Sequence, residues 1–385
     1  FLYNTSLERS ADDDNVIVLT LERKDADALG MNANQAAAYA SAFESWAENG
    51  ALGAAIASLT NQNAFFDAYD QLLPEYAASA IQFAMASNDS AIGALANRLE
   101  AVRRSPEETG GLWVQEFGYF ADRAGTAFGP GYRGQGIGVA VGFDRPVGPF
   151  YAVGVNFVGA ASEVSEVEGV DDPMSAITGQ LGAYAGSRVS GVNFDIYGGA
   201  GFDSFEHNRR VVIGEFDASP SAEWTGYHIT GSARVSRDFE FGGRYYARPA
   251  LSVDYLHLFE EGYTETGGGI GVDLSIADRD STSFTGSAVL TMGALFENSS
   301  RWWSPVVRLG YRSEFSNDIL ETEARFADYD DTFILRSQQL PGSGLLFGFG
   351  VSAGSGYSTF SLDYDADVRD DFIRHTARLV MRMVF

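Results

Sequence analysis

The connections between the expected β-strands constrain the fold more than any other feature of this sequence. Beyond residue 110, runs in which apolar residues alternate with small or polar ones are separated by turn-rich segments that are alternately long and short. Short turns at one end and long loops at the other are typical of transmembrane β-barrels. We place twelve strands, an even number, at residues 112–121, 136–145, 149–160, 175–187, 192–205, 222–237, 244–260, 281–296, 302–315, 343–354, 357–366 and 373–385.

The final expected strand shows the alternation most plainly. The opposite faces differ in character, because Arg378 and Arg382 share one face and every residue of the other is apolar. Arginine on such a strand requires a wet lumen, since a charge facing lipid costs free energy. The apolar face consists of Ala377, Leu379, Met381, Met383 and Phe385. The sequence therefore predicts an all-β transmembrane barrel of twelve antiparallel strands.

Composition narrows the classes of function. The formal net charge is −26 and lysine occurs only at Lys24, so the chain lacks the clustered basic residues that bind nucleic acid. No apolar run approaches the roughly 18 residues of a membrane-spanning helix. The four histidines are scattered without the spacing of metal ligands. We therefore expect no nucleic-acid partner, no metal and no cofactor.

The first part of the chain follows a different pattern. Residues 1–24 contain two alternating runs joined by a turn-rich segment, which is typical of a β-hairpin. Alanine is dense from residue 25 to residue 110, and apolar residues at helical spacing begin after Asn32. We expect one helix from Asn32 that ends at Gly50, a second from Leu52 and a further one around residues 65–72.

The last helix of this region is expected to be the longest, from Pro74 to about Arg104. At 1.5 Å per residue it would extend about 45 Å, which is enough to cross an outer membrane. Its second half is thin and polar, and small side chains suit a narrow pore. We expect this helix to thread the barrel, with polar residues Asn88, Asn97, Arg98, Arg103 and Arg104 in the pore.

Three segments resemble known proteins. Residues 112–119 (LWVQEFGY) and 142–148 (GFDRPVG) resemble the first two strands of the autotransporter β-domain. The tail from His375 to Phe385 resembles the terminal strand of outer-membrane proteins. With the preceding helices and hairpin, the similarity spans nearly the whole chain. It implies a barrel in the outer membrane of a Gram-negative bacterium, a pore helix, and a passenger exported N-terminally through the barrel.

The resemblance also implies an organisation and a set of partners. Residues 1–24 would be the end of the passenger, residues 25–110 a helical linker with the pore helix, and residues 111–385 the barrel. The implied partners are the passenger in cis, outer-membrane lipid and lipopolysaccharide, and the barrel-assembly machinery. That machinery would recognise Leu379, Met381, Met383 and Phe385. Because the chain starts at Phe1 without a leader, we expect a piece of a longer, processed precursor.

Charge pairing is the main prediction for the pore. Arg98, Arg103 and Arg104 could pair with acidic residues of the lumen, because a confined region of low dielectric rewards opposite charges. The acids expected there are Glu116, Asp195, Asp254 and Asp363. Such pairing would close the channel to ions.

Two other functions remain open on the sequence alone. A channel or porin would fit the barrel but would leave the long helical prefix unexplained. An outer-membrane hydrolase is suggested by Gly350–Gly354, which matches a nucleophile-elbow motif, although that motif requires a strand-to-helix turn and this one lies within an expected strand. Some autotransporters cleave their pore helix at an Asn-Asn junction, and neither Asn88–Asp89 nor Asn97 lies in such a junction.

Overall fold

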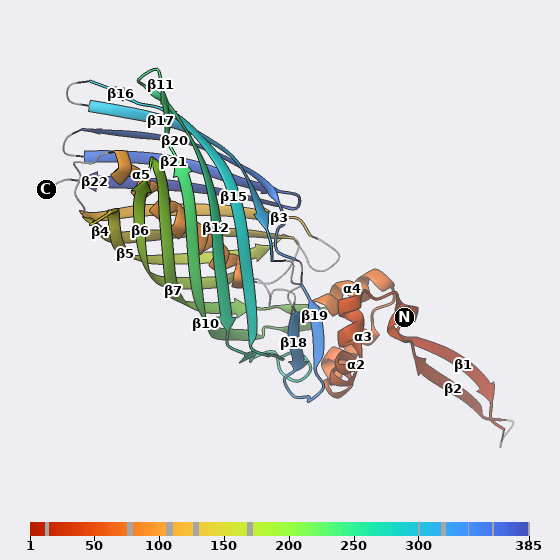
Figure 1. Cartoon of the computed structure of the whole chain (residues 1–385). Helices are drawn as coiled ribbons and strands as arrows, with labels where there is room; N and C mark the ends of the chain where they lie inside the picture. Colours follow the sequence, from red (N-terminus) through yellow and green to blue (C-terminus); the bar gives the residue numbers. More distant parts are fainter. Residues whose placement is uncertain are drawn as a thin grey trace.

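The computed structural model describes residues 1–11, 15–74, 80–104, 111–125, 131–167, 172–298, 301–316, 321–337, 339–355 and 358–383. A closed barrel surrounds one long helix, α5, and a smaller helical body lies beyond one end of the barrel (Figure 1). A hairpin projects from that body, on the side away from the barrel.

Twelve long antiparallel strands form the barrel, and each pairs with its neighbours in chain order. The sheet closes because the first strand, β3, pairs with the last, β22, from Val114↔Met381 to Arg123↔Phe372. The prediction of a twelve-stranded barrel is therefore confirmed, and each strand lies where the alternation placed it. The strands are β3 Gly111–Arg123, β4 Tyr132–Val147, β5 Phe150–Glu166, β6 Met174–Val189, β7 Val192–Asn208, β10 Ser221–Arg237, β12 Tyr245–Glu260, β15 Arg279–Ala294, β17 Arg301–Glu314, β20 Gly344–Ser355, β21 Ser358–Arg369 and β22 Phe372–Met383.

The packing of β3 on β4 explains which face of the first strand points inward. Three aromatic residues of β3 lie in the lumen directly opposite glycines of β4, so each of these rings covers a position without a side chain. A Cβ at Gly142, for example, would lie 2.5 Å from the Trp113 ring. The pairs are Trp113↔Gly142, Phe117↔Gly138 and Tyr119↔Gly136. The alternation along β3 alone left this choice open.

The two ends of the barrel differ in their connections. One end, which we call the short-turn end, has the tight turns and two minor strands, β11 Phe239–Phe241 and β16 Phe296–Glu297. The other, the long-loop end, has loops that contain strands of their own: β8 Val211–Ile213, β9 Phe216–Ala218, β13 Tyr263–Thr264, β14 Leu274–Ile276, β18 Glu321–Phe326 and β19 Phe333–Arg336. Strands β13, β14, β18 and β19 form a separate four-stranded sheet. The sequence predicted only loops there, because each strand is short.

Four helices precede the pore helix: α1 Ala26–Leu29, α2 Ala33–Glu48, α3 Gly50–Ala57 and α4 Gln62–Asp70. Asparagine starts three of them. The Asn32 side chain accepts a hydrogen bond from Gln35 N, and Asn32 N donates to Gln35 Oε1, which completes a capping box for α2. Gly50 was predicted to end a helix, but it is the first residue of α3, because Asn49 both ends α2 and caps α3.

These four helices pack against the sheet of β13, β14, β18 and β19, and we call the helices and sheet together the cap. Its core contains the aromatic residues Tyr39, Trp46, Phe65 and Tyr69, with the Trp46 and Tyr69 rings 5.5 Å apart. Strands β1 Tyr3–Arg9 and β2 Ile17–Arg23 form the predicted hairpin beside the cap, and both strands are exposed on both faces. The long loops therefore support an independent hydrophobic core outside the barrel.

Helix α5 spans Ala80–Arg104 and runs through the barrel from the long-loop end to the short-turn end (Figure 1). Its 25 residues correspond to about 38 Å. The predicted end at Arg104 agrees with the structure, whereas residues 75–79 of the predicted helix lie outside the described residues. No helix in the described part of the chain combines the length and apolar character of a membrane crossing.

Candidate functional site in the barrel lumen

One face of α5 packs against the barrel wall formed by β3 to β7. Ala91 and Ala94 are fully buried there and share a cluster with Leu95, Trp113 and Phe117. Small residues at these positions let the helix backbone lie close to the aromatic side chains of β3. Another face of the helix lies close to β22, since a Cβ at Gly93 would lie 2.5 Å from Nη2 of Arg378.

Arg98 anchors α5 to β4. Its Nε and Nη2 atoms donate to the two carboxylate oxygens of Asp144 at 2.7 and 2.8 Å. The Tyr184 hydroxyl donates to Asp144 Oδ2 at 2.7 Å and accepts from Trp113 Nε1 at 2.7 Å. Asp144 has no exposed surface, so this carboxylate depends on Arg98 for its charge balance. The bidentate geometry also fixes the rotation of the helix about its axis.

Arg103 anchors the following turn to β7. Its Nη1 donates to Asp195 Oδ2 at 3.0 Å and to the Tyr151 hydroxyl at 2.6 Å, and that hydroxyl in turn donates to Asp195. Nε and Nη2 of Arg103 are buried without a described hydrogen-bond acceptor. The prediction paired Arg103 with a lumenal acid, and the structure brings it together with Asp195.

Two acidic residues of α5 reach the other side of the barrel. Asp89 binds Arg312 of β17, with oxygen–nitrogen distances of 2.6 and 3.0 Å, and also contacts Arg374 of β22. Glu100 pairs with Arg248 of β12 at 2.6 Å. Together with Arg98 and Arg103, these residues form ion pairs with strands on several sides of the barrel, namely β4, β7, β12, β17 and β22. We call the part of α5 from Asp89 to Arg103, with its partners, the ionic segment.

Apolar residues surround the first turns of α5 at the long-loop end, and we call this ring the collar. Phe83 is 2% exposed, its ring centroid is 6.5 Å from that of Phe205, and Trp224 stacks on Phe205 at 5.4 Å. The helix contributes Ala80, Ile81, Phe83, Ala84 and Met85, and the barrel and its loops contribute Tyr132, Val164, Met174, Ala176, Phe205, Ala222, Trp224, Leu256, Leu258 and Leu340.

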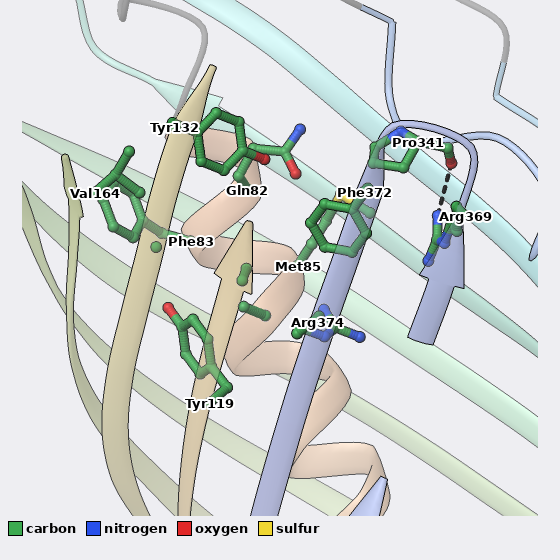
Figure 2. A pocket seen from close by; sticks show the side chains of 13 residues that line it. Gln82, Phe83, Met85, Tyr119, Tyr132, Val164, Pro341, Arg369, Phe372 and Arg374 are labelled. Carbon is green, nitrogen blue, oxygen red and sulfur yellow. Dashed lines mark hydrogen bonds between the residues drawn. The ribbon is translucent and has the colours of Figure 1, made fainter. Parts of the chain in front are cut away.

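Figure 2 shows the side of the collar where α5 faces β3, β4 and β22. Phe83, Met85, Tyr132 and Phe372 line a cavity there of only about 20 Å³, which is room for about one water molecule. Arg369 Nη1 donates to the carbonyl oxygen of Pro341 at 2.6 Å and holds that loop over the cavity (Figure 2). The collar is therefore nearly filled with side chains.

The remaining predicted pore residues occupy different environments. Asn88 is buried and accepts a hydrogen bond from Thr230 Oγ1 at 2.7 Å, whereas Asn97 donates to Asp363 Oδ2 at 3.5 Å. The backbone of Arg104 ends α5, and its side chain lies outside the described residues.

Apart from Asp195, no predicted lumenal acid pairs with an arginine of α5 in the described contacts. Asp363 pairs with Arg308 of the barrel wall, and Asp254 accepts a hydrogen bond from Ser232 at 2.6 Å. Glu116 was expected in the lumen, but its side chain is exposed on the outer face, because Trp113 and Phe117 take the inward parity of β3. The prediction for Glu116 is therefore wrong.

The predicted assembly signal lies on the outer face of β22 where it is described. Leu379 and Met381 are 47% and 45% exposed. The side chain of Met383 and all of Phe385 lie outside the described residues.

Sequence reasoning missed the partner of Arg98 and the acidic residues of α5. Asp144 had been noted only as part of the 142–148 segment. Its position two residues after Gly142, on the same face of the strand, would have placed it in the lumen. Asp89 and Glu100 complement lumenal arginines such as Arg312 and Arg374, and the arginine face of the last strand was the available signal.

Polar contacts join the helices of the cap to the long loops and to the sheet that they carry. Arg209, just after β7, pairs with Glu265 at 2.7 Å and donates to the carbonyl oxygens of Gln71 and Val272. Asn34 and the backbone of Arg336 exchange two hydrogen bonds, at 2.7 and 2.9 Å. These contacts link the helices to loops that are distant in sequence.

The cap also contains a buried carboxyl group. Burial raises the pKa of Asp70, and the hydrogen bond from Gln35 Nε2 at 2.7 Å offsets this only in part. The charged form of the Asp70 carboxyl group therefore lowers the stability of the folded cap slightly.

Two sequence features that could suggest catalytic or metal chemistry can be compared with the described residues. Gly350–Gly354 lies inside β20 and not at a strand-to-helix turn. In the described part of the chain, no three His, Cys, Asp or Glu side chains are placed to hold a metal ion.

Comparison with known proteins agrees with the barrel fold. Residues 112–367 match the family model described as the autotransporter β-domain. The translocator domain of the autotransporter NalP from Neisseria meningitidis is similar in structure, with a TM-score of 0.56, 13% identity, and coverage of 78% of this chain and 99% of that one. The β-domain of the Bordetella autotransporter BrkA is also similar, with a TM-score of 0.51 and 16% identity. The match covers 72% of this chain and 100% of that one. A search of curated proteins gives no match. Because the family match extends over more than half of its residues, this chain belongs to the autotransporter β-domain family.

Proposed function

We propose that this chain carries a covalently attached N-terminal passenger through the outer membrane and afterwards closes its own pore with α5. The observation that supports this most directly is the position of α5 inside a closed barrel, tied by ion pairs to β4, β7, β12, β17 and β22. A segment N-terminal to the barrel that enters at one end and leaves at the other connects the two sides of the membrane. The passenger would then lie at the long-loop end, with the cap.

The direction of transport follows from the loops. In outer-membrane barrels the short turns face the periplasm and the long loops face the outside. Helix α5 therefore starts at the cell surface and ends in the periplasm, next to the start of β3. The cap would assemble outside the cell after α1 to α4 have passed through the barrel.

Two kinds of contact would close the pore after transport. The collar would exclude water at the outer mouth, and the ionic segment would hold the helix in register below it. This role requires no catalytic group. A free porin is less well supported, because the helix fills much of the lumen that a porin would leave open.

Surface exposure of the N-terminus tests the transport role. A protease-cleavable tag placed before Phe1 in the full precursor should be cut when protease is added to intact cells. A control chain lacking residues 372–385 cannot close the barrel and should leave the tag protected. A tag that stays protected while the barrel shows a heat-dependent gel shift would contradict the proposal.

Charge reversal tests the closing role separately. Arg98→Glu with Arg103→Glu would place carboxylates against Asp144 and Asp195, so like charges would push the helix from its site. We expect higher ion conductance of the reconstituted protein. A matched control is Arg133→Glu with Arg210→Glu, since both side chains are exposed at the long-loop end. Equal conductance of the two double variants would argue against closure by these pairs.

A further inference from the structure

A second cavity lies beside α5 in the ionic segment, and its lining is more polar than that of the cavity in the collar. It has a volume of about 150 Å³ and separates the helix from β10, β12, β15, β17, β21 and β22. Its lining includes three arginines, Arg234, Arg308 and Arg378, and two acids, Glu100 and Asp365. A space of this size has room for several water molecules or one small polyatomic ion.

Both acids of the lining already have arginine partners. Asp365 contacts Arg308 at 3.3 Å and also Arg378. Glu100 pairs with Arg248, which lies outside the lining of the cavity. The negative charges of the cavity are therefore balanced without Arg234.

Arg234 differs from the other lumenal arginines. It has the inward parity of β10, but no described residue accepts a hydrogen bond from its guanidinium group or forms an ion pair with it. Two further arginines, Arg103 and Arg248, act on the charge of Arg234 electrostatically, as do the acids Glu100 and Asp195. A partly buried cation without an acceptor is unfavourable, and the cost is relieved when an anion binds.

We propose that this cavity binds a small inorganic oxyanion of the phosphate class, held mainly by Arg234. A guanidinium group presents a planar fork of donors that matches two oxygens of a tetrahedral anion. Ser252 is the ladder partner of Arg234 on β12 and is paired in turn with Ser287 of β15, so both serines line the cavity on the same wall as Arg234. Their hydroxyl oxygens are 2.8 Å apart. One of the two hydroxyl protons is used in that contact, so the other can be donated to the anion. This site goes beyond the translocator role and does not depend on it.

Titration of the full chain with inorganic phosphate tests the site. The protein is kept in detergent at low ionic strength, and the heat of binding is measured by calorimetry. We expect saturable binding to one site, and Arg234→Gln should weaken it about tenfold or more, because a charge-assisted hydrogen bond is lost. Arg237→Gln is the matched control, since Arg237 is exposed three positions along the same strand, and it should bind as the unmodified chain does.

A second variant keeps the test meaningful if Arg234→Gln fails to fold. Ala250 lines the cavity and is 7% exposed, so Ala250→Met should fill the space without removing a charge and should abolish binding. Absence of saturable heat with the unmodified chain would overturn the proposal. Equal binding by Arg234→Gln would also overturn it, and chloride that binds as tightly as phosphate would contradict the assignment to an oxyanion.

Discussion

The collar and the ionic segment hold the same helix by different forces. In the collar, Phe83 and its neighbours pack against Phe205 and Trp224, and the space left beside them is about 20 Å³. In the ionic segment, ion pairs hold the helix, and a cavity of about 150 Å³ lies beside it. Apolar packing excludes water but gives little orientation, whereas bidentate ion pairs fix orientation and tolerate water.

The energetic consequences of damage should therefore differ between the two regions. An intact buried ion pair adds little net stability, because desolvation offsets the attraction, but loss of one partner leaves an uncompensated charge. Loss of an apolar side chain from the collar removes its transfer free energy and leaves a cavity. Variants of each region can break or sharpen this comparison.

The largest effect is expected from removal of Arg98. Arg98→Ala leaves Asp144 buried without its cation and should lower the free energy of unfolding by about 3–5 kcal/mol. Denaturant unfolding of the protein in lipid vesicles, followed by tryptophan fluorescence, measures this. The double variant Arg98→Ala with Asp144→Ala removes both charges and should be less destabilised than the single one. A larger loss in the double variant would show that the pair is not coupled.

The collar should respond differently to Phe83→Ala. We expect a loss of about 3 kcal/mol together with a rise in ion conductance, because water would enter the outer mouth. Phe347→Ala is the control, since Phe347 is 43% exposed on the outer face of β20. It should leave conductance unchanged. A conductance change with Phe347→Ala, or none with Phe83→Ala, would contradict the role of the collar.

The outward position of Glu116 predicts a smaller effect of opposite sign. A carboxylate on the lipid-facing side is unfavourable, so Glu116→Leu should stabilise the barrel by about 1 kcal/mol in vesicles. Asp363→Leu, which removes the inward-facing partner of Arg308, should destabilise it. If Glu116→Leu destabilises the barrel as Asp363→Leu does, the assigned facing of β3 is incorrect.

The smallest effect concerns the cap and its pH dependence. Because the pKa of Asp70 is raised on folding, the folded cap binds this proton more tightly than the unfolded chain does. Cap stability should therefore be fully present below the ordinary Asp range and should fall as pH rises through the raised pKa. Asp70→Asn should flatten this dependence, which limited proteolysis of α1 to α4 at several pH values would reveal. An unchanged pH profile would exclude Asp70 as its source.

The sequence predicted the barrel well because the period of a strand is short and repeats. Each of the twelve alternations specifies its own strand, and the connection lengths specify the two ends independently. The small sheet of β13, β14, β18 and β19 was not predictable, because strands as short as Tyr263–Thr264 carry no readable alternation. Gly50 was misassigned because glycine ends many helices, while the neighbouring Asn49 determines the local structure here.

The pore contacts were only partly predictable, because pairing depends on the facing of each strand. Asp195, one of the four expected acids, is the partner of Arg103, but Arg98 binds Asp144 and Glu116 points outward. The glycines of β4 decide the facing of β3, and they do so through packing between strands that a single-strand pattern cannot reveal. Arg234 shows the same limit, since the absence of an acceptor for it among the described residues is evident only in three dimensions.

The most direct test of the account is the single-channel conductance of the full chain against a chain lacking residues 1–104. Both proteins are reconstituted in planar bilayers after a heat-dependent gel shift has shown that each barrel is folded. The account predicts a small conductance for the full chain and a several-fold larger one for the shortened chain, because α5 occupies the lumen. Equal conductance of the two folded barrels would contradict closure of the pore by α5.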